Sequence, residues 1–198
     1  GTGKSTCIGV LRQYAEMNGV RAAWTASTGV ASHALRGTSV YAWTGMGRPR
    51  GTAEEFNAYM RRVQHPTSAA GGRLRGTHLL VVDEVSMLPP FVLLWLDKAA
   101  RAVREEPRKP YGGMQVVLVG DFLQLQPVRK AADGRDETPL FASEVIARSQ
   151  LVPCMLTRPM RQDADDDLAR MLEYIRRGAP LPTPLRDALL SRVTPADD

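Results

Sequence analysis

The sequence of 198 residues has little cysteine, few aromatic residues and no long apolar run. Its two cysteines are Cys7 and Cys154, and neither belongs to a Cys/His group with metal-ligand spacing. We therefore expect no disulfide framework, and we interpret both cysteines as buried, small apolar side chains in a reducing compartment. No run of about 18 apolar residues occurs, so a membrane-spanning helix is not expected.

The composition is otherwise that of an ordinary globular domain. Hydrophobic residues make up 43% and charged residues 24% of the chain, which is long enough for one good-sized core. There are 26 Lys and Arg residues against 21 Asp and Glu, which gives a formal net charge of +5. This mildly basic balance suits a polyanionic partner, although a basic surface without a partner explains it equally well.

The first six residues match the second half of a phosphate-binding loop, G-x-x-x-x-G-K-[ST]. Glycines there let backbone N–H groups turn toward an anion, and the following helix directs its positive end at the same phosphates. Lys4 would neutralise phosphate charge, and the Ser5 hydroxyl would bind Mg²⁺. The alternative is a flexible Gly/Thr segment ahead of an amphipathic helix. The nucleotide-binding residues expected here are Gly1, Thr2, Gly3, Lys4, Ser5 and Thr6.

Hydrophobic patterning predicts helices that alternate with buried strands, which is typical of a parallel α/β sheet. We expect a helix after the phosphate loop, ending at Asn18-Gly19. The other expected elements are strands at residues 20–25, 79–82, 115–119 and 150–156, helices at residues 54–63, 89–104, 161–178 and 185–193, and loops at residues 66–76 and 129–138.

An acidic pair, Asp83-Glu84, closes the apolar strand at residues 79–82. Ligands bind at the carboxyl ends of strands in such sheets. The first carboxylate would hold Mg²⁺ and the second would polarise the attacking water. Another apolar strand ends at Gly120-Asp121, and Gln124 follows where an amide could sense the γ-phosphate or orient a water. The alternative for the acidic pair is a charged strand end that faces water.

Hydroxyl and aromatic side chains gather after the first predicted strand. Backbone amides and hydroxyls suit nucleic-acid phosphates, and aromatic rings can stack on bases. In the alternative interpretation Trp43 belongs to the core and the hydroxyls cap helices. Residues 48–76 are basic, and they form either an insertion that touches nucleic acid or a solvated helix with a mobile loop. The candidate DNA-binding residues are Thr25, Ser27, Thr28, Gly37, Thr38, Tyr41 and Trp43.

The order of these segments resembles the first motor domain of superfamily 1 helicases of the RecD type, and in particular the petite-integration-frequency (Pif-type) DNA helicases. The Asp-Glu-Val-Ser-Met and Gly-Asp-Phe-x-Gln-Leu segments are specific to this group, whereas the phosphate loop is not. The similar segments are residues 3–5 for motif I, 25–31 for motif Ia, 37–43 for motif Ib, 82–87 for motif II, 120–125 with 127–128 for motif III, and Leu156 with 161–163 and 175–178 for motif IV and its helix.

The resemblance implies a RecA-like parallel sheet flanked by helices, truncated at the N-terminus within the phosphate loop. It implies that the domain binds ATP and Mg²⁺, with Asp83 as metal ligand, Glu84 as catalytic base, Gln124 as γ-phosphate sensor and Arg161 as arginine finger. Residues 1–178 would form the domain, with a possible insertion at residues 48–76. Residues 179–198 would be a Pro-rich linker and short helix leading to a second motor domain.

The same resemblance implies a 5′-to-3′ helicase that translocates on single-stranded DNA and unwinds forked or structured DNA in genome maintenance, including repair, recombination and telomere or mitochondrial DNA maintenance. The expected location is the nucleus or the mitochondrion, with no membrane partner and a monomer as the working expectation. A single motor domain is expected to bind nucleotide weakly and to unwind nothing by itself.

Three positions depart from the usual family pattern. Tyr41-Ala42-Trp43 stands where the family usually has His-[ST]-Phe, Gln126 replaces a proline of motif III, and Met160 replaces an aromatic residue. None of these changes removes a group that takes part in the chemistry. Two other classes of protein stay open, namely another phosphate-loop enzyme such as a small-molecule kinase and a non-catalytic nucleic-acid-binding fragment.

Overall fold

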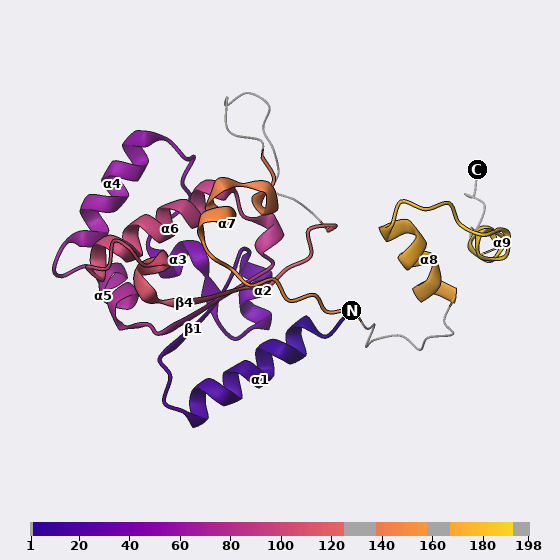
Figure 1. Ribbon diagram of the computed structural model, residues 1–198, viewed down its shortest axis with the longest axis horizontal. Coiled ribbons are helices and arrows are strands. Elements are labelled where there is room, and N and C mark those ends of the chain that lie inside the picture. Colours follow the sequence, from indigo (N-terminus) through magenta and orange to yellow (C-terminus); the bar gives the residue numbers. More distant parts are fainter. Residues whose placement is uncertain (1, 125–137, 158–166, 192–198) are drawn as a thin grey trace, which may run out of the picture. The chain divides into compact units, whose positions relative to one another are not determined.

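The computed structural model describes residues 2–124, 138–157 and 167–191 of the chain (Figure 1). Contacts divide the chain into two units, one of residues 9–153 and one that combines Gly1–Ile8 with Cys154–Asp198. The elements are α1 (Lys4–Met17), β1 (Ala22–Ala26), α2 (Gly29–Ala34), β2 (Thr38–Ser39), α3 (Val40–Thr44), α4 (Ala53–Gln64), α5 (Ala69–Gly76), β3 (Leu79–Asp83), η1 (Val85–Met87), α6 (Pro90–Val103), η2 (Pro110–Gly113), β4 (Gln115–Leu118), η3 (Leu140–Ala142), α7 (Glu144–Arg148), α8 (Asp167–Arg176) and α9 (Thr183–Leu190).

The strands of the larger unit form a parallel sheet in the order β2-β1-β3-β4. The register pairs Ala26 with Asp83 and Val82 with Leu118. Because all pairs are parallel, the carboxyl ends of the strands lie along one edge of the sheet. The strand β3 is buried on both faces, which explains its continuous apolar sequence.

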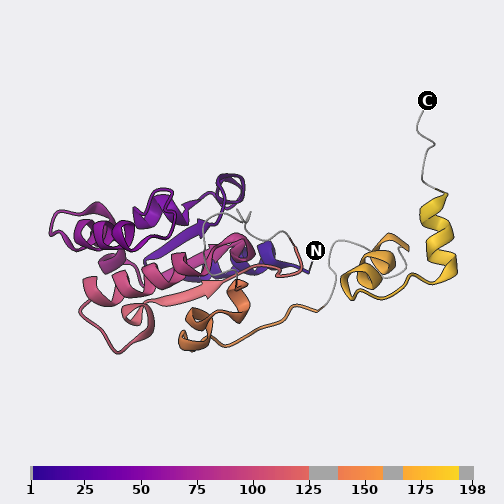
Figure 2. The same cartoon turned by 90° about the horizontal axis from the view of Figure 1, so that it is seen from above.

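One face of the sheet packs against a layer of helices that contains α3, α4, α5 and α6 (Figures 1 and 2). Leu80 and Val82 of β3 point into this layer, where Leu93 and Leu96 of α6 are fully buried. Burial of each such side chain contributes roughly 1.5–3 kcal/mol to the free energy of folding. The aromatic rings of Phe56, Tyr59 and Phe91 surround Trp95, with centroids 5.3–6.1 Å from its ring.

The other face of the sheet contacts the part of α1 that belongs to the larger unit, residues 9–17. Arg12 of α1 lies over the indole ring of Trp24, with its Cζ atom 4.7 Å from the ring centroid, and donates a hydrogen bond to the carbonyl of Leu35. Side chains alternate along a strand, so Trp24 faces away from the layer that Ala23 contacts. The same alternation along β3 places Asp83 opposite to Val82, on the face that this part of α1 contacts.

In the smaller unit, α8 and α9 contact each other. Gly178, in the left-handed region at φ 63°, follows α8, and Pro184 stands in the first turn of α9. Met171 of α8 and Leu185 of α9 are buried. No helix in the part of the chain that the structure describes is long and apolar enough to cross a bilayer.

The parallel α/β sheet expected from the sequence is confirmed, and so are the helices around residues 54–63 and 89–104. The loop expected at residues 66–76 is wrong, because α5 occupies most of it. A Cβ atom at Gly71 would lie 2.2 Å from the Val63 carbonyl oxygen, so this glycine allows α5 to pack closely against α4. The structure also shows no strand among residues 150–156.

The expectation that both cysteines are buried is wrong as well. Cys7 and Cys154 are free and exposed. In α1 the buried positions are Ile8 and Ala15, seven residues apart along one face, and Cys7 lies outside that stripe.

The domain boundary expected at residue 178 remains a prediction.

Candidate nucleotide-binding edge of the sheet

The carboxyl edge of the sheet brings together residues from three strands. Ser27 follows β1, Glu84 follows β3, and Gly120 comes soon after β4. The backbone N–H of Ser27 donates to the Asp83 carbonyl, 3.0 Å away, and that of Val85 donates to the Val119 carbonyl, also 3.0 Å away. Backbone hydrogen bonds therefore continue past the strand ends and fix the residues that follow.

Asp83 and Glu84 have defined backbone positions at this edge. Oδ1 of Asp83 accepts a hydrogen bond from the Glu84 N–H at 2.9 Å, and both residues are partly buried. Glu84 has φ 51° and ψ 43°, a left-handed conformation that costs a residue with a side chain roughly 1–2 kcal/mol. Backbone strain of this kind concentrates at functional sites. The turn leads into η1, whose first residue, Val85, is buried.

The segment after β4 passes close to η1 at Gly120. A Cβ atom on Gly120 would lie 2.9 Å from Cγ1 and 3.1 Å from the backbone nitrogen of Val85, so a side chain does not fit. Beyond it, the Gln124 side-chain amide donates to Oδ2 of Asp121 at 3.2 Å, and the Leu123 N–H donates to Oδ1 of Asp121, also at 3.2 Å. Asp121 therefore orients Gln124.

Asp121 was given no role by the sequence analysis. The signal was present in the spacing, because the two side chains are three residues apart in a turn. Ser86 was missed too. Its hydroxyl is buried in η1 and has no partner among the described residues. The hydroxyl of Ser27, after β1, is likewise buried without a partner there. Polar groups buried without a partner are uncommon and call for an explanation.

The start of α1 has the local form expected of a phosphate loop. Gly3 has φ 91°, and the helix begins immediately after it at Lys4, with the Cys7 N–H donating to the Gly3 carbonyl. The first turn of α1 contains no acidic residue, which leaves the positive helix end uncompensated and suited to an anion. Ser5 and Thr6 are exposed. Gly1 and Arg161 lie outside the described residues.

Two of the candidate DNA-binding residues are corrected by the structure. Thr25 is fully buried and its hydroxyl donates to the Val81 carbonyl at 2.7 Å, because it faces the core layer. Trp43 is 6% exposed and packs in the core, which leaves no ring face for a base. For Trp43 the core interpretation was therefore correct.

The remaining candidates lie near the carboxyl end of β1 and in or beside the two-residue strand β2. Thr28 caps α2 through its hydroxyl, Tyr41 is partly buried, and Thr38 is exposed. Burial raises the pKa of the Tyr41 hydroxyl above its ordinary value. Gly37 approaches β1 so closely that a Cβ atom would lie 2.1 Å from the Trp24 carbonyl oxygen. Its glycine identity is therefore explained by packing.

The residues present fit Mg²⁺, which is usually held by one or two protein oxygens together with substrate phosphates. Asp83 and Ser5 each offer an oxygen atom of the required kind. Among the described residues, no cluster of three or more His, Cys, Asp or Glu side chains could hold a metal ion.

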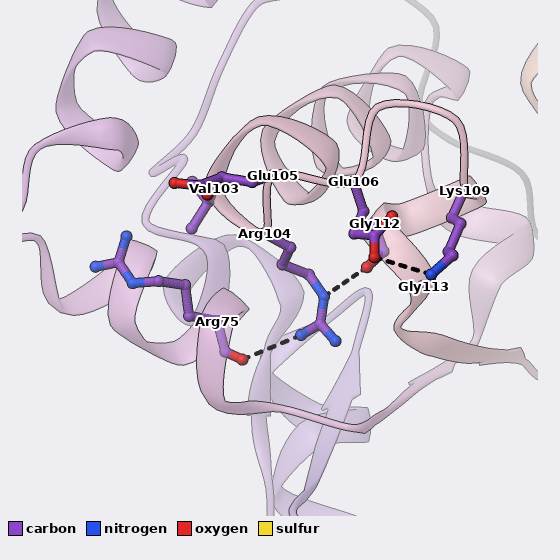
Figure 3. Close-up of a pocket in the computed structure, with 8 residues that line it drawn as sticks. All are labelled: Arg75, Val103, Arg104, Glu105, Glu106, Lys109, Gly112 and Gly113. Atoms are coloured by element: carbon purple, nitrogen blue, oxygen red, sulfur yellow. Dashed lines mark hydrogen bonds and ion pairs between the residues drawn. The ribbon is translucent and has the colours of Figure 1, made fainter.

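A hollow of about 490 Å³ lies at the opposite, amino end of β3 and β4, where α5 and α6 end (Figure 3). Arg104 lines this hollow, and its guanidinium donates to the carbonyls of Leu74, Thr77 and Gly112 at 2.7–2.9 Å. Lys109 forms an ion pair with Glu106 across 2.8 Å. These groups join helix ends to the sheet, so we assign this hollow a structural role.

The parallel sheet, with its acidic pair and its Gly-Asp turn at one edge, is that of a RecA-like domain. The PIF1-like helicase family model matches residues 1–178, and the chain therefore belongs to this family.

Curated relatives agree with this assignment. The chain is 34% identical over 180 residues to the ATP-dependent DNA helicase RRM3 of Saccharomyces cerevisiae, covering 90% of this chain and 24% of that protein. It is 32% identical over 216 residues to the ATP-dependent DNA helicase PIF5 of Trypanosoma brucei brucei, covering 97% of this chain and 23% of that protein. The chain thus spans about a quarter of the length of these relatives.

Solved structures show the same fold. The Pif1 helicase from Candida albicans matches with a TM-score of 0.80 and 30% identity, over 100% of this chain and 44% of that chain. The Pif1 helicase from Bacteroides in complex with ADP-AlF3 and single-stranded DNA matches with a TM-score of 0.78 and 28% identity, over 100% of this chain and 45% of that chain.

Proposed function

We propose that this chain is the first motor domain of an ATP-dependent DNA helicase that moves 5′ to 3′ on single-stranded DNA and unwinds forked or structured duplexes. The observation that carries the proposal is the carboxyl edge of the sheet, where Asp83, Glu84 and the Asp121–Gln124 turn follow neighbouring strands. Family membership and the ADP-AlF3 and single-stranded DNA bound by a related Pif1 helicase support it.

In this proposal each side chain has one task. Lys4 and the loop amides of residues 1–6 bind the triphosphate. Ser5 and Asp83 would hold Mg²⁺, which would offset phosphate charge when bound. Glu84 accepts the proton of the attacking water, and Gln124 orients that water or contacts the γ-phosphate. Arg161 stabilises the charge that develops in the transition state.

We propose that single-stranded DNA lies along the carboxyl end of β1 and the adjacent β2, against Thr28, Gly37, Thr38 and Tyr41. Ser27 belongs to the same edge, but its hydroxyl is buried, so we do not propose that this hydroxyl contacts DNA directly. Thr38 is exposed and Tyr41 is partly so, which makes them the best placed of these residues for direct contact. Thr25 and Trp43 support this segment from the core instead.

The domain organisation and location are proposals too. Residues 1–178 form the motor domain and residues 179–198 lead to a second motor domain, as the greater length of the relatives suggests. We propose genome maintenance in the nucleus or the mitochondrion, including repair, recombination and telomere or mitochondrial DNA maintenance. The free thiols of Cys7 and Cys154 suit a reducing compartment. A monomer is the simplest working state.

The test is ATP hydrolysis and fork unwinding by the full-length protein, each with and without single-stranded DNA. We expect DNA to stimulate ATP hydrolysis and a fork with a free 5′ tail to be unwound. Lys4→Ala should abolish both activities while single-stranded DNA still binds. ATP hydrolysis that DNA does not stimulate, together with no unwinding of the fork, would favour another kind of phosphate-loop enzyme.

A further inference from the structure

The segment from Gly37 to Gly45 is proposed to contact DNA. Its helix and strand are too short to be stable without contacts to the rest of the domain. It contains the two-residue strand β2 and the five-residue helix α3. An isolated helix of this length is unstable in water, and a two-residue strand contributes little. Its start is fixed by the close approach of Gly37 to Trp24 and by pairing with β1. Trp43 and Thr44 anchor α3 in the core, and the carbonyls at its end are also bound by side chains from other helices.

Two arginines provide these bonds at the carboxyl end of α3. Arg73 of α5 donates from Nε to the Trp43 carbonyl at 2.6 Å and from Nη2 to the Ala42 carbonyl at 3.2 Å. Arg62 of α4 donates from Nη2 to the carbonyl of Gly45, the residue that caps α3. The last carbonyls of a helix lack partners within it, and positive charge there is stabilising.

Both arginines lie on helices that pack against the core. The guanidinium of Arg62 lies 6.0 Å from the ring centroid of Tyr59, which is buried in the core. α4 and α5 meet where Gly71 approaches the Val63 carbonyl, and α5 contacts α3 directly (Figure 1). Arg73 is partly buried, so its guanidinium group has little freedom to turn toward solvent.

We propose that Arg73, assisted by Arg62, is a positioning residue that holds the Gly37–Gly45 segment in the geometry that grips single-stranded DNA. This inference rests on the proposed function. In this proposal the arginines act through the bonds that they donate to backbone carbonyls of α3 and its cap, and not through DNA. The basic segment at residues 48–76 therefore acts on DNA binding through α3.

The experiment compares Arg73→Lys and Arg73→Gln with the same two changes at Arg61, an exposed residue of α4. Binding of a fluorescent oligo-dT by the full-length variants is measured at several salt concentrations. Lysine keeps the charge but cannot donate to both carbonyls in the planar geometry of a guanidinium. We expect both Arg73 variants to bind roughly tenfold more weakly, as loss of one or two hydrogen bonds allows. The Arg61 variants should stay within about twofold of the wild type.

The salt dependence separates positioning from contact. Loss of a phosphate contact lowers the slope of log K against log salt by about 0.7 for single strands. We expect the slope to be unchanged in Arg73→Gln. A slope that falls by this amount, or an Arg73→Lys variant that binds like the wild type, would overturn the inference.

Amide hydrogen exchange without DNA provides a readout that is independent of the proposed function. Exchange at residues 37–45 should be faster in Arg73→Lys and Arg62→Lys than in Arg61→Lys, with the rest of the sheet unaffected. Unchanged exchange there would also overturn the inference. If exchange responds as expected but the wild-type protein does not bind oligo-dT, the proposed function is wrong and α3 is held for another purpose.

Discussion

The side-chain amide of Gln124 is held by the carboxylate of Asp121, which accepts its hydrogen bond at 3.2 Å. The same carboxylate accepts the Leu123 N–H, so it fixes the turn and the amide together. A residue that contacts the γ-phosphate or the attacking water must be oriented before the reaction, because misplacement by a fraction of an ångström reduces the rate. We therefore expect Asp121 to act through Gln124.

A double-mutant cycle tests this dependence. Asp121→Ala and Gln124→Ala should each lower DNA-stimulated ATP turnover by about tenfold or more, and the double variant should be no slower than Gln124→Ala. The measurement is kcat for ATP hydrolysis by the full-length variants at saturating single-stranded DNA. Two effects that multiply in the double variant would show that Asp121 acts separately.

Gly120 is predicted to tolerate no side chain. In Gly120→Ala the new Cβ atom would meet backbone and side-chain atoms of Val85, which cannot all move away. We expect a loss of about 1–3 kcal/mol in the free energy of unfolding, typical of overpacking, together with lower ATP turnover because Glu84 precedes Val85. Gly72→Ala is the control, since nothing lies within 4 Å of its Cβ position in α5. A melting temperature for Gly120→Ala equal to that of the control would show that the loop accommodates the methyl group.

The cap of α4 is predicted to make stability depend on pH. Desolvation raises the pKa of Glu55, but hydrogen bonds from the backbone N–H groups of Arg50, Thr52 and Gly51 outweigh it and hold that pKa below its ordinary value of 4.5. A lowered pKa in the folded state means stability that is present above pH 4.5 and lost as pH falls through the folded-state value.

Glu55→Gln should therefore melt at a lower temperature than the wild type at pH 7, and the two should converge as the pH falls through the lowered pKa of Glu55 in the folded state. The measurement is thermal unfolding of both proteins across that range. Glu54→Gln removes a charge from the same turn but leaves the capping bonds intact, so it is the matched control. A difference between wild type and Glu55→Gln that persists at low pH would point to packing as the cause.

The sequence predicted the sheet and its acidic edge because these depend on local patterns. Four consecutive apolar residues before Asp83 indicate a strand buried on both faces, and the structure has that strand. The capping box of Thr52 and Glu55 and Pro90 in the first turn of α6 are equally local signals.

The rest depended on contacts between distant residues. A loop was expected where α5 lies, and the close approach of Gly71 to Val63 can be known only once α4 and α5 are packed. Thr25 and Trp43 carry chemistry suited to DNA, but Thr25 lies on the face of β1 that the core covers, and Trp43 is buried where α3 packs into that core. The roles of Arg62 and Arg73 likewise became evident only from their bonds to α3.

The central claim is that ATP is hydrolysed at the carboxyl edge of this sheet with Glu84 as the base. It is tested most directly by ATP turnover and ATP affinity of full-length Glu84→Gln in the presence of single-stranded DNA. The glutamine keeps the size of the side chain but cannot accept a proton, so turnover should fall by about 10²–10⁴-fold while the Kd for ATP stays within about threefold. Turnover close to that of the wild type would contradict the account.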